Sequence, residues 1–231
     1  MFFPFYDSTY ILVLIGVIVS MMASAKLNAT YQRYSAVRSM CGLTGAEAAK
    51  RLLNSQGIYD VTIRRVPGSL TDHYDPRSKT VNLSDAVYGS TSIAAIGVAA
   101  HECGHAMQDA ADYSPLRIRA ALVPAANLGS QLAWPLILVG LLLGSGGSGL
   151  AFAGIVLFSM AVLFQLVTLP VEYNASHRAV TLLDSTGILA GQEVGQTRSV
   201  LNAAALTYVA AAAASILQLL RLLMLFNRRR D

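Results

Sequence analysis

The chain has 231 residues, of which 54% are hydrophobic and only 13% are charged. This composition is too apolar for an ordinary soluble domain and predicts an integral membrane protein. The formal net charge of +4 is spread through a polar stretch without a basic stripe interleaved with aromatics, so we expect a solvated face near anionic lipid headgroups and no nucleic-acid partner.

Four apolar segments are long enough to be considered as transmembrane helices, since a span needs about 20 residues. They are residues 10–25, 121–143, 150–169 and 203–226. The second is interrupted by Pro124, Gln131 and Pro135, which a span tolerates when neighbouring helices satisfy the freed backbone groups. We therefore expect a mainly α membrane protein with about four transmembrane helices.

The first segment is short unless Phe2, Phe3 and Phe5 extend it, and Ala23-Ser24-Ala25 resembles a signal-peptide cleavage site. A secretory signal also needs a positively charged leading region, whereas the only charge in residues 1–9 is Asp7. We interpret residues 1–25 as an uncleaved transmembrane anchor.

Residues 26–120 are predicted to form a small α+β unit. Thr44 and Glu47 have the spacing of a capping box, which predicts a helix from there to about Gln56. Residues 61–66 alternate like a half-buried strand, and a turn at residues 75–78 precedes a second strand over 80–83. We expect a two-stranded ribbon in which strand 80–83 is an edge that pairs with an extended substrate.

The next helix, over about residues 92–110, carries the sequence His101-Glu102-Cys103-Gly104-His105. Residues four apart share one face of a helix, so both imidazoles can bind a single zinc ion while Glu102 acts as general base on the metal-bound water. The apolar first half of the helix is expected to be buried and the second half, from Gln108, to approach water. Eight apolar residues are too few for a span, which places the site near the membrane surface.

A catalytic zinc ion usually has three protein ligands and one position for water. The candidates for the third ligand are Glu172, His177, His73 and Asp184. We favour Glu172, because the helical hairpin of residues 121–169 returns the chain to the side it left and Glu172 follows directly in a polar island. Asp184 is the weaker alternative, in a segment faintly similar to the Leu-Asp-Gly signature of intramembrane zinc proteases.

Lysine and arginine are concentrated between the first two spans, and this sets the expected orientation. The stretch 26–121 holds eleven, whereas the N-terminal tail and the turn at 144–149 hold none: Lys26, Arg33, Arg38, Lys50, Arg51, Arg64, Arg65, Arg77, Lys79, Arg117 and Arg119. The positive-inside tendency therefore places this stretch in the cytoplasm. The basic tail Arg228–Arg230 does not fit, because four complete spans put it outside.

These expectations divide the chain into five parts. They are an anchor (1–25), a cytoplasmic unit with the motif helix (26–120), a transmembrane hairpin (121–169), a segment with the third zinc ligand (170–202), and a last transmembrane helix with a basic tail (203–231). Cys41 and Cys103 are expected to be free thiols on the reducing side, with Cys103 packed rather than bound to metal.

Four motifs in the same order, HECGHAMQ with LTDHYDPRSKTVNLS upstream and LPVEYNASHRA and LNAAALTYVAAA downstream, resemble the YugP-like membrane zinc metallopeptidases over nearly the whole chain. Their layout is similar to that of the HtpX-like and CAAX-processing zincins, in which the glutamate of an E-x-x-A-D pattern completes the zinc site. Glu172 and Ala175 match that pattern, but Ser176 replaces the aspartate. Ser176 or Asn174 is then the weaker substitute as a partner of the ligands.

The resemblance implies one catalytic Zn²⁺ and endopeptidase-type hydrolysis of proteins or peptides at a bacterial plasma membrane. Glu102 is the expected base, and His73, Tyr74 or His177 could stabilise the oxyanion by donating a hydrogen bond. The alternative function is a zinc-binding scaffold or metal-handling protein without catalysis. A closed structural site usually shows four ligands, commonly including cysteines, and so we favour catalysis.

Overall fold

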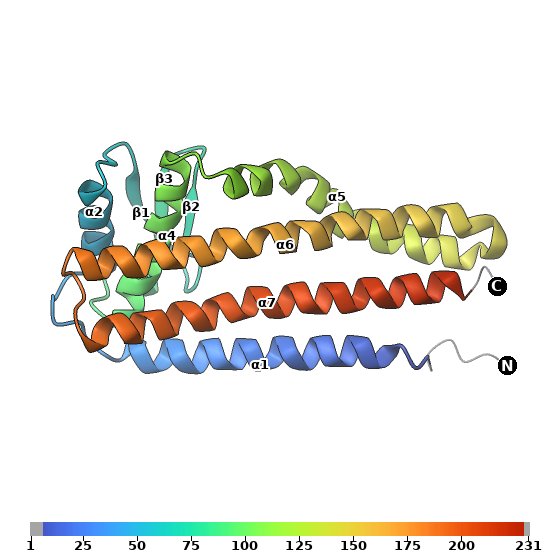
Figure 1. Cartoon of the computed structure of the whole chain (residues 1–231), viewed down its shortest axis with the longest axis horizontal. Coiled ribbons are helices and arrows are strands. Elements are labelled where there is room, and N and C mark those ends of the chain that lie inside the picture. Colours follow the sequence, from blue (N-terminus) through green and yellow to red (C-terminus); the bar gives the residue numbers. More distant parts are fainter. Residues whose placement is uncertain (1–6, 229–231) are drawn as a thin grey trace. The chain divides into compact units, whose positions relative to one another are not determined.

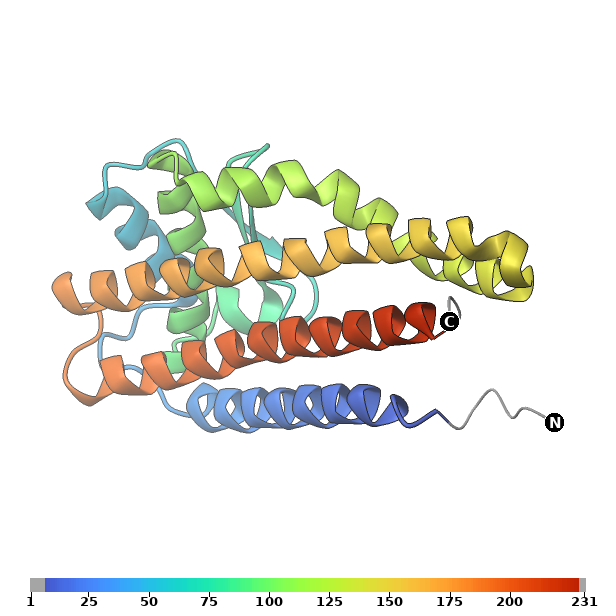
Figure 2. The same cartoon turned by 45° about the vertical axis from the view of Figure 1, so that its right-hand side comes forward.

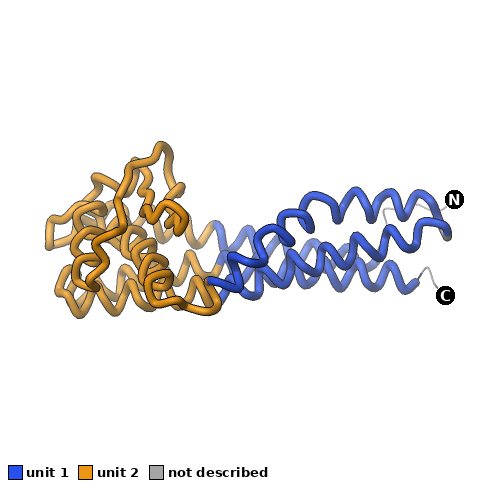
Figure 3. The backbone as a smooth tube through the Cα atoms, turned by 90° about the horizontal axis from the view of Figure 1, so that it is seen from above, with its two compact units in different colours: residues 1–24, 117–169, 207–231 blue, residues 25–116, 170–206 orange. Residues whose placement is uncertain are grey.

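The computed structural model describes residues 7–228 and is mainly helical (Figure 1). The elements follow in the order α1 (Tyr10–Ser35), α2 (Gly45–Ser55), β1 (Thr62–Val66), β2 (His73–Asp75), β3 (Thr80–Ser84), α3 (Asp85–Tyr88), α4 (Ile93–Ala110), α5 (Ser114–Leu142), a short 3-10 helix (Gly144–Gly147), α6 (Ser148–Ser185) and α7 (Gln192–Asn227). The chain forms two compact units, coloured in Figure 3. Unit 1 holds residues 1–24, 117–169 and 207–231, and unit 2 holds residues 25–116 and 170–206.

The four helices α1, α5, α6 and α7 are long and apolar enough to cross a membrane. In the most apolar stretch of each, only 11–28% of the residues are buried inside the protein. Their remaining apolar side chains are stabilised by an apolar surrounding rather than by water. The prediction of a mainly α membrane protein with four transmembrane helices and a small α+β unit is therefore confirmed.

Small residues bring the helices of unit 1 together. A Cβ atom at Gly16 of α1 would come within 3.1 Å of the Ala214 side chain on α7, and one at Gly129 of α5 within 2.4 Å of the Leu157 carbonyl oxygen on α6. Such close backbone approach is the usual way in which spans associate without a hydrophobic driving force. Ala214 ends the alanine-rich run of α7, which places further small side chains along this helix.

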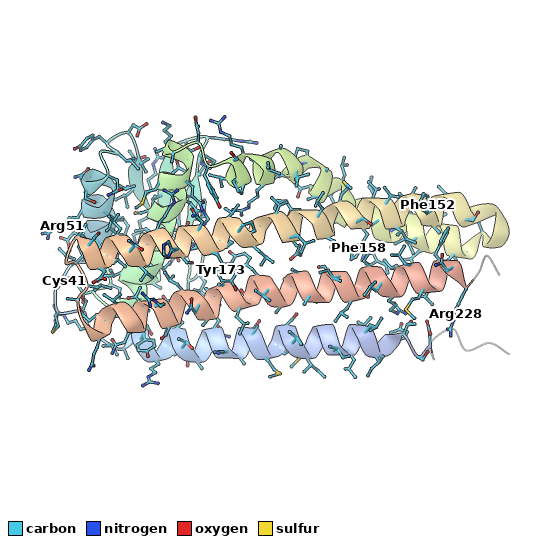
Figure 4. All side chains as sticks on the ribbon, in the orientation of Figure 1. Cys41, Arg51, Phe152, Phe158, Tyr173 and Arg228 are labelled. Carbon is cyan, nitrogen blue, oxygen red and sulfur yellow. The ribbon has the colours of Figure 1, made fainter. Side chains whose placement is uncertain are left out.

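The described ends of the chain meet in unit 1. The Arg228 guanidinium, labelled in Figure 4, lies 3.3 Å from the Asp7 carboxylate, and Arg221 lies 4.2 Å from the ring centroid of Tyr10. The C-terminal end of α7 is therefore beside the N-terminal end of α1, as four complete spans require. Phe2, Phe3, Phe5, Arg229 and Arg230 lie outside the described residues.

Unit 2 contains a three-stranded sheet in the order β1-β3-β2. β3 pairs with β1 in parallel and with β2 in antiparallel fashion, and four of its five residues are buried. The prediction that strand 80–83 is a free edge in a two-stranded ribbon is wrong: β3 is central, and the short strand β2 was missed. Because β1 and β3 run in the same direction, the chain must return between them, and β2 forms on that return.

Side-chain caps begin two helices of unit 2, and the cap of α2 is the predicted one. Thr44 and Glu47 form a complete capping box at α2, and the Ser92 hydroxyl accepts a hydrogen bond from the Ala95 amide at the start of α4. α4 packs against α2 on one side and against the sheet on another, as Figures 1 and 2 show. This contact buries the apolar half of α4 and fixes the helix that carries both histidines.

Candidate metal centre

The two histidines of α4 lie one helical turn apart at the edge of the buried core of unit 2. Their ring centroids are 4.8 Å apart and the rings are nearly perpendicular, at 84°. His105 is buried and His101 is partly exposed. Both Nε2 atoms face α6, which supplies the third group of the site.

Glu172 lies on α6, a single helix of 38 residues. At a rise of 1.5 Å per residue this helix is about 57 Å long, which exceeds the roughly 30 Å of a hydrocarbon core. Residues 170–185 belong to unit 2, beyond the most apolar part of the helix. The carboxylate of Glu172 is thereby carried to the motif histidines within one unit.

The distances within this group suit a zinc ion. The Glu172 Oε2 atom is 3.3 Å from His101 Nε2 and 3.7 Å from His105 Nε2, and one ligand atom from each residue lies within 4.8 Å of the others. Ligand atoms about 2.0–2.2 Å from a tetrahedral zinc lie about 3.4 Å from one another. Two imidazoles and one carboxylate are also a donor set that catalytic zinc sites use.

Gln108 orients His105. Its Oε1 atom is 3.0 Å from His105 Nδ1, and its Nε2 atom donates hydrogen bonds to the Val171 carbonyl (2.8 Å) and to Asn174 Oδ1 (3.0 Å). Since Oε1 can only accept, His105 carries its proton on Nδ1 and presents the Nε2 lone pair to the metal position. Gln108 is completely buried, whereas Asp109 is partly exposed and Asp112 is exposed. The prediction that the second half of the helix approaches water is therefore wrong for Gln108 and correct from Asp109 onward.

A hydroxyl takes the corresponding place at His101. Ser176 Oγ lies 3.1 Å from His101 Nδ1, which again leaves Nε2 for the metal. Of the two substitutes considered for the missing aspartate, Ser176 therefore contacts a histidine of the site directly. Asn174 acts one step further out, because its Oδ1 atom contacts Gln108 and accepts a hydrogen bond from Arg178 Nε (2.8 Å).

Nearby carboxylates and burial shift the pKa of His105 in opposite directions. Burial lowers its pKa, but the contacts with Glu172 and the negative charge of Glu102 outweigh this effect, so the pKa lies above the ordinary histidine value. Glu102 is itself buried, at 7% exposure, on the same helix. Because zinc binds the neutral imidazole, metal binding therefore competes with protonation of His105.

The remaining predicted site residues lie outside the group of His101, His105 and Glu172. His73 is exposed on β2, with Nδ1 against the Thr71 carbonyl (2.9 Å) and Nε2 against Asn82 Nδ2 (3.2 Å). The Tyr74 hydroxyl donates to Asp109 Oδ2 (2.8 Å). His177 is exposed and, five residues after Glu172, lies about 140° around α6 from it. Asp184 is also exposed.

The two cysteines have different environments. Cys103 is fully buried and its thiol points to the Ala49 carbonyl on α2, at 3.6 Å. Burial raises its pKa well above the ordinary thiol value. Cys41 is exposed, and neither cysteine is in a disulfide. The interpretation of both as free thiols, with Cys103 used for packing, is confirmed.

Two residues around the site were missed from the sequence. Gln108 follows His105 by three residues and His101 by seven, and this spacing puts all three on one face of a helix. Arg178 follows Asn174 by four on α6. The helical spacing was the available signal, but the polar character of Gln108 was taken as a sign of exposure.

Comparison with known proteins points in the same direction as the geometry. A family model described as "Putative neutral zinc metallopeptidase" matches residues 9–227. A protein of Bacillus subtilis (strain 168) named "Putative membrane protease YugP" is 48% identical over 213 residues, which cover 92% of this chain and 94% of that protein. No solved structure matches the chain.

Proposed function

The chain belongs to this family of zinc metallopeptidases, and from that premise we propose that it hydrolyses peptide bonds of protein or peptide substrates with one catalytic zinc ion. His101, His105 and Glu172 would hold the ion. The single observation that carries the proposal is a buried carboxylate, Glu102, beside a group of three metal-binding side chains. A three-ligand site keeps a position for water, and Glu102 is the base that such chemistry needs.

The residues of the chain divide the work of hydrolysis. Bound zinc would supply a Lewis acid that polarises the scissile carbonyl and makes water more acidic. Glu102 would take the proton from water and pass it to the departing amine. Gln108 and Ser176 hold the imidazoles with Nε2 toward the reaction centre. The oxyanion roles of His73 and His177 stay predictions.

The four apolar helices, the distribution of basic residues and the relative named a membrane protease support a proposal for the cellular setting. We propose that the protein crosses the bacterial plasma membrane four times. Unit 2, which carries the candidate site and nine of the eleven basic residues of the stretch 26–121, would face the cytoplasm. The other two basic residues, Arg117 and Arg119, lie near the start of the second span. The substrates would be chains that reach this membrane surface.

The alternative is a zinc-binding scaffold without catalysis, and Glu102→Gln separates the two functions. We expect the purified variant to retain zinc, because Glu102 is not one of the three grouped ligands. Its rate of hydrolysis of an unfolded model protein should fall by at least about 100-fold. Glu172→Ala is expected to lose zinc as well. Zinc bound by the wild type without cleavage of any substrate in a diverse peptide library would support the scaffold.

A further inference from the structure

A groove of about 560 Å³ lies between α1 and α7 in unit 2, on residues that the proposed hydrolysis does not use. Figures 1 and 2 show these two helices side by side. The residues that line it are Lys26, Ala29, Thr30, Arg33 and Tyr34 from α1, and Ser199, Asn202, Ala203 and Leu206 from α7. On both helices the spacing of three and four residues marks a single face, so two facing stripes form the walls.

The lining combines an apolar floor with a basic and hydrogen-bonding rim. Ala203 is buried between the helices, whereas Lys26, Arg33 and Asn202 are exposed. The Arg33 guanidinium lies 5.4 Å from the ring centroid of Tyr34. Both charged residues among those lining the groove are cations, so the groove attracts an anion and offers amide and hydroxyl donors to it.

The groove also lies where both helices change from apolar to polar. Lys26 is the first charged residue after the apolar run of α1, and Leu206 belongs to the apolar part of α7 while Ser199 and Asn202 precede it. An occupant with a phosphate at the rim and acyl chains along the apolar part of the helices matches this order. Basic pockets between membrane helices near the cytoplasmic surface are known to suit anionic lipid headgroups.

We propose that this groove binds the phosphate headgroup of one anionic phospholipid, with Lys26 and Arg33 as the charged contacts. The two residues are seven positions apart, which corresponds to about two turns, or about 10.5 Å along α1. That length accommodates a phosphate and its alcohol substituent, and the groove volume lies within the range of about 300–1,000 Å³ that is usual for small-molecule sites. The bound lipid would stabilise the packing of α1 against α7. Residues 192–206 of α7 follow the segment that carries Glu172.

The test uses the full chain in nonionic detergent micelles, with phosphatidylglycerol as the probe and phosphatidylcholine as the neutral comparison. Native mass spectrometry counts the lipids that remain bound. We expect one phosphatidylglycerol per chain, held in preference to phosphatidylcholine, and about 30-fold weaker binding in the double variant Lys26→Gln/Arg33→Gln, from roughly five-fold per basic side chain. The charge-conserving variant Lys26→Arg/Arg33→Lys should bind the lipid, which excludes a simple folding defect.

The matched control is Lys50→Gln/Arg51→Gln, which removes two exposed charges from α2 in the same unit (Arg51 is labelled in Figure 4). It should bind phosphatidylglycerol like the wild type. Equal losses in both double variants would reduce the effect to general surface charge and overturn the site. Equal retention of both lipids, or unchanged binding in Lys26→Gln/Arg33→Gln, would overturn it too.

A phosphate could also reach the groove as a free ion, and competition separates the two sources. Inorganic phosphate and glycerol phosphate are added at millimolar concentration before the lipid is counted. We expect phosphatidylglycerol to stay bound, because its acyl chains add apolar contact with the helices. Displacement of phosphatidylglycerol by free phosphate at this millimolar concentration would overturn the assignment to a lipid.

Discussion

Gly104 on α4 lies directly against the backbone of Ala175 on α6. A Cβ atom at position 104 would come within 2.4 Å of the Ala175 carbonyl oxygen. Gly104 immediately precedes His105, and Ala175 follows Glu172 by one turn of α6. The absence of a side chain at position 104 therefore sets the spacing of the two helices at the point where they bring the histidines and the carboxylate together.

Gly104→Ala is expected to push α4 and α6 apart. The clash is with backbone, which cannot turn aside as a side chain can, so we expect a cost of about 1–3 kcal/mol in stability and a clear loss of zinc affinity. Thermal unfolding in detergent and zinc titration against a chelator measure the two effects. Gly195→Ala is the control, because a Cβ atom there meets nothing within 4 Å; it should keep zinc and gain up to about 1 kcal/mol. Wild-type zinc affinity in Gly104→Ala would contradict this account.

Gln108→Leu is expected to weaken zinc binding about 10–100-fold, as is usual when the partner of a metal-binding histidine is removed. Gln108→Glu retains an acceptor for His105 Nδ1 and should lose less zinc affinity, although it gives up the hydrogen bond to the Val171 carbonyl. The chain has four histidines, so nitrogen NMR of histidine-labelled protein can follow the tautomer of His105 directly. The exposed Gln56→Leu serves as the control. A His105 tautomer that is unchanged in Gln108→Leu would show that Gln108 does not orient the ring.

The sequence allowed the zinc group to be predicted, because its components have local signals. The four-residue spacing of His101 and His105 defines a helix face without any tertiary knowledge, and the hairpin argument placed Glu172 on the same side of the membrane. Helix starts at Thr44 and Ser92 were also predictable, since a cap acts on amides two or three residues away. These features depend on neighbours along the chain.

What the sequence did not reveal depends on contacts between distant segments. Gln108 reads as a surface residue until α6 supplies Val171 and Asn174 as partners for its amide. The strand β2 has only three residues, and it pairs with β3 on the edge opposite to β1. The need for glycine at position 104 arises from the backbone of α6, which lies directly against it. Tertiary packing decides all three cases.

Tyr74→Phe tests whether Tyr74 serves the structure or the reaction. Its hydroxyl joins β2 to α4 through Asp109, so the variant should be less stable by about 1 kcal/mol and should still hydrolyse substrate. A loss of turnover at unchanged stability would instead assign the hydroxyl to the oxyanion. Tyr59→Phe is the matched control because Tyr59 is exposed.

The same hydroxyl gives a pH dependence. Desolvation and the hydrogen bond to Asp109 raise the pKa of Tyr74 above the ordinary value. The folded protein thus retains a proton that the unfolded chain releases near pH 10, so this stabilisation is present below about pH 10 and is lost as the pH rises further. Above about pH 10, the free energy of unfolding of the wild type should fall more steeply with pH than that of Tyr74→Phe. Parallel curves would contradict the raised pKa.

Cys41 offers a direct measurement of the side on which unit 2 lies. Its side chain is exposed, whereas Cys103 is buried and its raised pKa disfavours the reactive thiolate. A membrane-impermeant maleimide should therefore modify one cysteine, Cys41 (labelled in Figure 4). If unit 2 faces the cytoplasm, intact cells remain unlabelled and inverted membrane vesicles become labelled, with Cys41→Ser as the blank. Labelling of intact cells would place the candidate site outside, and the excess of lysine and arginine between the first two spans would then have failed to set the orientation.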